Sequence, residues 1–308
     1  MIRNKMALRL LRPADLFLPL SFLVASLMGR GVAALELFIV FYATKLCALA
    51  TADGLRAAFA TQPSMKYVQG SVLTAIACQF FGAALASLIL YLVPGTRFLL
   101  PMVSCGLLLN IEHVFYEYLC AVGDTNSALF SRCITAVLTL LGLLLSMPPR
   151  HGIFEMTPVD PTWPMVTSGL SALVGLFISV ALGGSLRPVP NAQVLRRAPV
   201  SMLQAGLYPA LALAALTLLW PANFTPAPLF AGLLLYEACR TPFRRSPLES
   251  GPMNRILLIV ASAALACLVL FRFLIKTTLS APFAMTCAAL LIAAACAFAL
   301  YSSIKGRE

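Results

Sequence analysis

The dominant pattern along this chain is a series of long apolar runs separated by short polar connections. A helix rises about 1.5 Å per residue, so about 20 residues cross a hydrocarbon layer of roughly 30 Å. Breakers such as Gly-Arg-Gly at residues 29–31 separate the runs. The pattern predicts an all-α, polytopic membrane protein with about ten transmembrane helices, at residues 14–30, 33–52, 68–93, 98–121, 131–148, 164–184, 200–220, 226–240, 255–274 and 281–302.

Basic residues are distributed unevenly among the connections. With a cytoplasmic N-terminus, 16 of the 22 Lys and Arg residues lie in inside segments, Arg132 among them. Five lie outside and Lys45 lies within a helix. The positive-inside rule therefore predicts that both termini are cytoplasmic, and we expect the cell (plasma) membrane as the location. We expect the basic, apolar N-terminus to be a retained first helix rather than a cleaved signal peptide.

Composition separates this chain from soluble and nucleic-acid-binding proteins. It is 60% hydrophobic and 11% charged, whereas a soluble domain carries about 25% charge. The net charge of +11 comes from basic residues that bracket apolar runs, so it indicates topology rather than a nucleic-acid partner. The nine cysteines lie within or at the edges of apolar runs and form no CxxC, which favours small buried side chains. We expect no metal site and no cofactor.

The strongest functional clue is a group of polar residues inside apolar runs. Each ionisable group at bilayer depth costs roughly 2.5–3.5 kcal/mol on insertion scales, so such groups usually line a cavity or pair with each other. Two interpretations stay open: a substrate or proton site inside a helix bundle, or a paired polar patch that determines helix packing. The candidate substrate- or proton-binding residues are Lys45, Gln79, Asn110, Glu112, His113 and Glu117.

Depth and spacing suggest how these residues pair. Lys45 and Glu112 lie at similar depths in the second and fourth runs, so we predict that Lys45 approaches Glu112 or His113. His113 and Glu117 are four residues apart and share one helix face. Since histidine changes charge near neutral pH, these two are candidate proton carriers. Glu36 lies nearer a helix end, and we expect it to reach the membrane interface by snorkelling.

Catalytic motifs are missing from the sequence. It has no HExxH and no Gly-rich phosphate loop. Asp53-Gly54 with Arg56 matches the start of a lipid-head-group transferase motif, but the further spaced aspartates of that motif are missing. We therefore expect no catalytic residues and no enzyme activity.

Several stretches resemble the multidrug/oligosaccharidyl-lipid/polysaccharide (MOP) exporter superfamily. Val-Gly-Asp-Thr at 122–125, within residues 118–147, is similar to the Leu-Gly-Asp-Thr-like turn between that superfamily's fourth and fifth helices. Residues 50–93 resemble its second-to-third helix junction, and SGLSALVGLFISVALGG at 168–184 resembles its sixth helix. LQAGLYPALALAAL at 203–216 resembles its seventh, with Pro209 in place. The resemblance covers about residues 14–215.

The resemblance implies an exporter or flippase fold with a shortened second lobe. The superfamily, which includes MATE-type exporters and lipid-linked sugar flippases, normally has twelve helices in two six-helix lobes. Here we expect a six-helix first lobe at 1–185 and a four-helix C-terminal group at 186–308, joined by the basic, Pro-rich connection at 185–199. The resemblance also implies a first-lobe cavity between helices one, two and four, where Lys45, Glu112 and His113 fall.

The function that follows is transport or flipping of an amphipathic or lipid-linked solute, with proton coupling. The expected partners are membrane lipid and a small-molecule or lipid-linked substrate. One alternative is a ten-helix drug/metabolite-type transporter, built as two inverted five-helix repeats, which fits the length and both cytoplasmic termini. The other is a non-transporting membrane scaffold or assembly subunit, which would have the same hydropathy.

Overall fold

The computed structural model describes residues 14–47, 65–92, 96–122, 124–146 and 159–181, together with Ala227, Phe230, Ala231 and Leu234. The chain divides into two compact units, Met1–Gly206 and Leu207–Glu308. All elements described in the first unit are helices. The runs predicted beyond residue 200, apart from the four residues named above, lie outside the described residues, and so do both chain termini.

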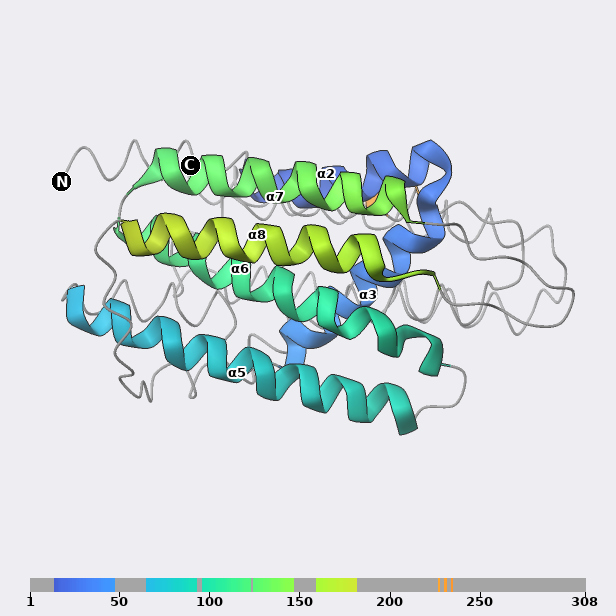
Figure 1. The fold of residues 1–308 in the computed structure, drawn as a ribbon, viewed down its shortest axis with the longest axis horizontal. Helices are drawn as coiled ribbons and strands as arrows, with labels where there is room; N and C mark the ends of the chain where they lie inside the picture. Colours follow the sequence, from blue (N-terminus) through green and yellow to red (C-terminus); the bar gives the residue numbers. More distant parts are fainter. Residues whose placement is uncertain are drawn as a thin grey trace, which may run out of the picture. The chain divides into compact units, whose positions relative to one another are not determined.

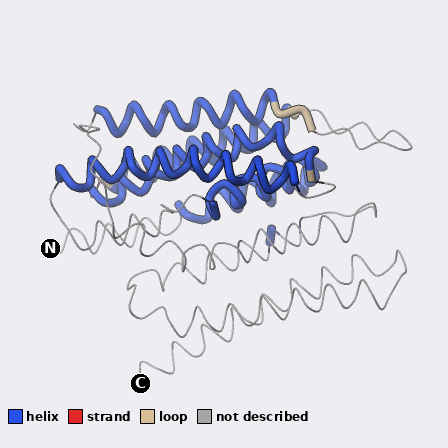
Figure 2. Tube along the Cα trace, turned by 90° about the horizontal axis from the view of Figure 1, so that it is seen from below, coloured by secondary structure: helices blue, strands red, loops and turns tan. Residues whose placement is uncertain are grey.

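The helical prediction is confirmed for the part of the first unit that the structure describes. Each of the six apolar runs predicted before residue 185 corresponds to one helix, in two cases extended by a short turn. Figures 1 and 2 show these helices lying side by side. They are α2 (Ala14–Ala25), α3 (Gly31–Cys47), α5 (Met65–Leu92), α6 (Val103–Val122), α7 (Thr125–Leu145) and α8 (Thr162–Ala181), with the turns η1 (Ser26–Arg30) and η2 (Arg97–Met102).

Gly29 separates α2 from α3. Its φ of +82° lies in the left-handed region that glycine adopts without a Cβ penalty. The Phe22 and Phe38 rings meet edge to face, with centroids 5.8 Å apart. In an unbroken helix these two residues would be about 24 Å apart, so the chain must turn back at Gly29 (Figure 1). The predicted break at residues 29–31 is confirmed. We call the end of the unit that carries this turn the Gly29 end.

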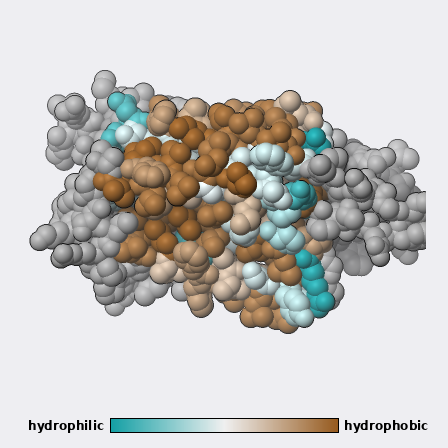
Figure 3. Space-filling model, in the orientation of Figure 1, coloured by the Kyte–Doolittle hydropathy of each residue, from teal (hydrophilic) through white to brown (hydrophobic). Residues whose placement is uncertain are grey.

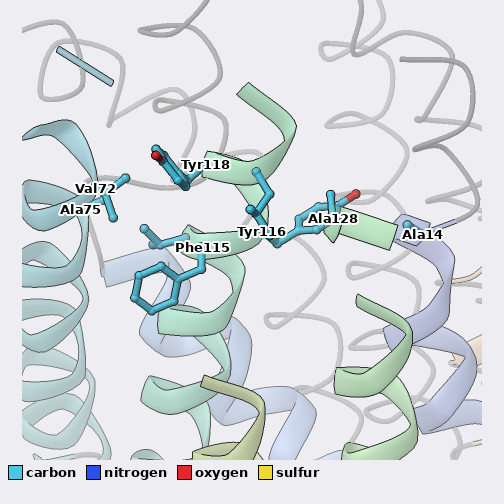
Figure 4. Packing of buried hydrophobic residues seen from close by; sticks show 9 residues of the cluster. Ala14, Val72, Ala75, Phe115, Tyr116, Tyr118 and Ala128 are labelled. Carbon is cyan, nitrogen blue, oxygen red and sulfur yellow. The ribbon is translucent and has the colours of Figure 1, made fainter. Parts of the chain in front are cut away.

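Helix α6 is the central element of the first unit. It packs against α3, α5, α7 and α8, while α2 packs against α7. Figure 4 shows Tyr116 of α6 directed toward Ala128 of α7, whereas Val72 and Ala75 of α5 lie on the other side of α6 near Phe115. The polar residues of α6 therefore lie on a helix that is surrounded by neighbours.

Close helix crossings depend on small residues. A Cβ added to Gly106 of α6 would lie 2.9 Å from the backbone carbon and oxygen of Val40 in α3. A Cβ on Gly175 of α8 would lie 3.1 Å from Cβ of Phe115. Small residues that let backbones approach are typical of helix packing inside membranes, where lipid removes the usual hydrophobic driving force.

The outward faces of the helices are apolar. Phe81 of α5, Phe130 of α7 and Phe177 of α8 are 59%, 60% and 72% exposed. Figure 3 shows a broad apolar surface over the described residues, with hydrophilic side chains toward its margins. Five stretches are long and apolar enough to cross a membrane, the first of which, Leu16–Phe41, runs through the Gly29 turn. Apolar faces of this extent suit contact with lipid, and the protein is an integral membrane protein.

Candidate functional site

Asn110 connects α6 to α3, one turn after the close approach of Gly106 to Val40. Its side-chain amide donates to the carbonyl oxygen of Phe41 at 2.9 Å and to the Thr44 hydroxyl at 2.7 Å. The same amide reaches the carbonyl oxygen of Gly106, one turn earlier on α6, at 2.9 Å. Asn110 is 1% exposed, so these bonds replace the water that the amide loses. Its donors are used in holding two helices together.

Glu112 forms a buried ion pair with Arg132 of α7. Arg132 Nη1 donates to Glu112 Oε2 at 2.6 Å, and Ser131 Oγ donates to Glu112 Oε1 at 3.3 Å. The two side chains of the pair are 0% and 4% exposed. Removing two charges from water costs several kcal/mol per ion, and close geometry with further hydrogen bonds is what offsets that cost. Both Glu112 oxygens have such a partner.

Arg132 belongs to the membrane-spanning helix, which corrects the sequence analysis. Helix α7 begins at Thr125 because Asp124 caps it: the carboxylate accepts from the Ser127 backbone N–H at 3.1 Å and from the Ser127 hydroxyl at 2.8 Å. Arg132 therefore lies two turns inside the span Asn126–Leu145. Arg132 was counted with the cytoplasmic connection in the sequence analysis because it lies at the start of the apolar run predicted at 131–148, whereas the helix begins six residues earlier, at Thr125.

Tyr116 joins the ion pair to His113. The Arg132 guanidinium carbon lies 4.9 Å from the centroid of the Tyr116 ring, within range of a cation–π interaction. The His113 ring stacks on the same tyrosine, with centroids 5.9 Å apart and planes inclined by 17°. Tyr116 is fully buried. An aromatic side chain therefore bridges a buried cation and a buried imidazole.

His113 and Glu117 lie on one face of α6, as their spacing predicted. His113 Nε2 is 3.8 Å from Glu117 Oε1. Both residues are buried, with exposed side-chain fractions of 6% and 0%. Together with the pair described above, two carboxyl groups, one guanidinium and one imidazole lie within about one and a half turns of α6. We call Glu112, His113, Tyr116, Glu117 and Arg132 the polar cluster.

The contacts given above do not include the other two predicted site residues, Lys45 and Gln79. Lys45 is in α3, but its side chain lies outside the described part of the structure, so the Lys45–Glu112 contact stays a prediction. The described partner of Glu112 is Arg132. Gln79 is buried in α5, 2% exposed.

Glu36 does not reach the membrane interface. Its exposed fraction is 3%, so the predicted snorkelling is wrong. Residues 33–41 of α3 are all buried, because the helix packs against α2, α5 and α6. The carboxyl instead accepts a hydrogen bond from the backbone N–H of Val159, just before α8.

No family model, curated protein or solved structure matches this chain. The resemblance to the MOP superfamily therefore stays an expectation. Within the described ranges, no group of three or more His, Cys, Asp and Glu side chains is arranged to hold a metal ion.

A helix-capping pattern in the sequence indicates that Arg132 lies inside a helix, and hydropathy alone does not detect this pattern. Asp124-Thr125 followed by Ser127 is a helix start with a capping side chain. A helix that begins there places Ser131, Thr135 and Thr139 on one face, beside Arg132, and all are buried. A helix start set at this cap, rather than at the beginning of the apolar run, would have placed Arg132 inside the membrane-spanning helix.

Proposed function

We propose that this protein is a membrane transporter or flippase that moves an amphipathic or lipid-linked solute, without covalent chemistry. The observation that carries the proposal is the polar cluster inside a membrane-spanning bundle. Ionisable groups at such depth are costly and most often mark a substrate or ion pathway. Arg132 adds a cation that suits an anionic head group, and the Tyr116 ring beside it suits an apolar or cationic portion.

The proposed topology has about ten transmembrane helices, with both termini in the cytoplasm of a cell whose plasma membrane holds the protein. Moving Arg132 into a helix leaves 15 of the 16 basic residues in inside segments against five outside, so the charge bias still supports this orientation. The shortened second lobe of an exporter-like protein and the two repeats of a drug/metabolite-type transporter both fit it.

Topology is tested by labelling engineered cysteines with a membrane-impermeant thiol reagent in sealed vesicles. Thr157→Cys and Ser246→Cys are expected to react from opposite sides of the membrane. Reaction of both from the same side would show that the number of helices between them is not the proposed one.

Proton coupling is assigned to His113 and Glu117. Their side chains are adjacent, and the imidazole of histidine exchanges protons near neutral pH, so it can pass a proton to or from the carboxyl group beside it. The test is reconstitution in proteoliposomes with fluorescent lipid analogues and amphipathic dyes as probes. Transport should respond to an imposed pH gradient, and His113→Ala combined with Glu117→Gln should abolish that response.

The matched control for this experiment is Arg97→Ala, at an exposed position in the same unit. It should leave the response to the pH gradient unchanged. Transport that continues to follow the gradient after both cluster changes would remove the proton role of His113 and Glu117.

A non-transporting scaffold is the second candidate, and one observation favours it. The Asn110 donors and both Glu112 oxygens are used by neighbouring helices, as expected of a patch that determines packing. The joint change Glu112→Leu with Arg132→Met separates the two functions. If the protein is a scaffold, this double variant stays folded and keeps its role. If the protein is a transporter, the double variant stays folded but no longer moves solute.

A further inference from the structure

Glu36 differs from the other carboxyl groups described inside the membrane-spanning helices. Glu112 and Glu117 have Arg132 and His113 within 4 Å. Glu36 is 3% exposed, and its Oε2 has no hydrogen-bond partner in the part of the chain that the structure describes. Its carboxyl accepts from one backbone N–H, that of Val159. Among the described residues, the structure gives it no cationic partner.

Arg97, on an element that packs against α3, and Asp160, beside Val159, both interact with other groups. Arg97 in η2 is exposed and lies over the Tyr91 ring, 4.5 Å from its centroid. Asp160, next to Val159, accepts both hydrogen bonds of Thr162. The titratable side chains described on the elements that pack against α3, or on the segment before α8, are Arg30, Cys78, Tyr91, Arg97, Cys105, Glu112, His113, Tyr116, Glu117, Tyr118, Cys120 and Asp160. None of them forms an ion pair with Glu36 among the described residues.

We propose that Glu36 is a proton-binding site that fastens the segment before α8 to α3 at the Gly29 end of the first unit. A buried carboxylate with one backbone donor, and no cation within the described residues, is far costlier than the neutral acid. The neutral acid needs little more than the bond from Val159, and its burial in the stretch 33–41, where every residue is buried, does not penalise it as it does a carboxylate. The bound proton is the ligand of this site.

Loss of the proton has a mechanical consequence. An ionised Glu36 needs water, and water reaches it when the segment at 159–161 moves off α3. Apart from the packing of the buried Val159 side chain, that segment has one other described hydrogen bond to the bundle. It runs from Cys105 Sγ of α6 to the Pro161 carbonyl oxygen at 3.9 Å, and a bond of that length is weak. Release of the Glu36–Val159 bond therefore loosens the start of α8. This proposal does not depend on the transport function.

The proton is tested by infrared difference spectroscopy of the full chain in lipid vesicles. The wild-type spectrum minus that of Glu36→Gln at pH 7 should show the carbonyl band of an un-ionised carboxyl. Carboxylate bands in that difference spectrum would overturn the proposal. Glu36→Met, neutral and of similar length, replaces Glu36→Gln if the latter does not fold. If both neutral variants fail to fold while Glu36→Asp folds, a charge is required there and the proposal is wrong.

The fastening is tested by hydrogen exchange of the Val159 and Asp160 amides, corrected for the intrinsic effect of pH. Protection in the wild type should fall by about tenfold as pH rises through the titration of Glu36, the effect of one or two hydrogen bonds. Glu36→Gln should show constant protection. Asp160→Asn and Cys105→Ala, which change neighbouring groups, should keep the wild-type response. An unchanged pH response in Glu36→Gln would overturn the proposed fastening.

Discussion

Arg132 and Glu112 are 20 residues apart in the chain, yet Arg132 Nη1 lies 2.6 Å from Glu112 Oε2 in the interior of the first unit. The bond joins α7 to the central helix α6. Each charge in this pair makes the burial of the other tolerable, so the two residues are expected to act as one energetic unit.

Breaking this pair on one side should be costly. Arg132→Met leaves Glu112 buried without its cation, and we expect the free energy of unfolding to fall by roughly 3–5 kcal/mol. The joint change with Glu112→Leu should recover most of that loss, because no charge is left unpaired. Denaturant unfolding in mixed detergent micelles measures both. Arg97→Met is the control, and single and double variants of equal stability would contradict the pairing.

Asn110→Leu should weaken the contact between α6 and α3. The change removes the donors that reach Phe41 and Thr44, and leaving buried acceptors without them costs about 1–3 kcal/mol. The same unfolding assay measures the effect. Asn126→Leu, at an exposed position on α7, should change stability little. Equal effects of the two substitutions would indicate that the Asn110 bonds contribute nothing specific.

Gly106→Ala tests the close crossing of the same two helices. The added methyl would lie 2.9 Å from the Val40 backbone, and overpacking of this kind costs about 1–3 kcal/mol. Gly169→Ala is the matched control, since its nearest new contact is Leu108 Cδ1 at 3.9 Å. Alanine there should leave stability unchanged or raise it by roughly 0.5–1 kcal/mol, through better helix propensity. A tolerated Gly106→Ala would mean that α3 and α6 are farther apart.

Gly29→Ala tests the turn between α2 and α3. No atom lies within 4 Å of the added Cβ, so the cost is backbone strain alone, about 1–2 kcal/mol at this positive φ. Gly29→Asn should cost less, because asparagine adopts the left-handed region more readily. The thermal unfolding midpoint should therefore be highest for the wild type, lower for Gly29→Asn and lowest for Gly29→Ala. Alanine as stable as glycine would mean that the chain does not turn here.

Asp160 should make a small pH-dependent contribution at the start of α8. Hydrogen bonds from the Thr162 hydroxyl and backbone N–H lower the pKa of its carboxyl below the ordinary 3.8. A lowered pKa in the folded state means that the contribution is present above pH 3.8 and is lost as pH falls below it. The stability difference between wild type and Asp160→Asn, followed by thermal unfolding from neutral to acidic pH, should shrink. A difference that stays constant over that range would contradict the shift.

Local features of the sequence determined much of the helical framework. The apolar runs predicted the six helices before residue 185 because hydropathy over about 20 residues is a local property. The break at Gly29 followed from the conformational freedom of glycine. The shared face of His113 and Glu117 followed from helix geometry, in which residues four apart are neighbours. Each of these needs no information about the rest of the chain.

Tertiary structure decided which groups meet. Depth along a helix allows several partners for Glu112, and the way α6 packs against α7 selects Arg132. The bonds of Asn110 to α3 depend on the close approach at Gly106. Burial of Glu36 depends on neighbours far away in sequence, Val159 among them. Hydropathy gives the depth of a residue but not the direction in which it faces, and that direction is set only when the helices pack.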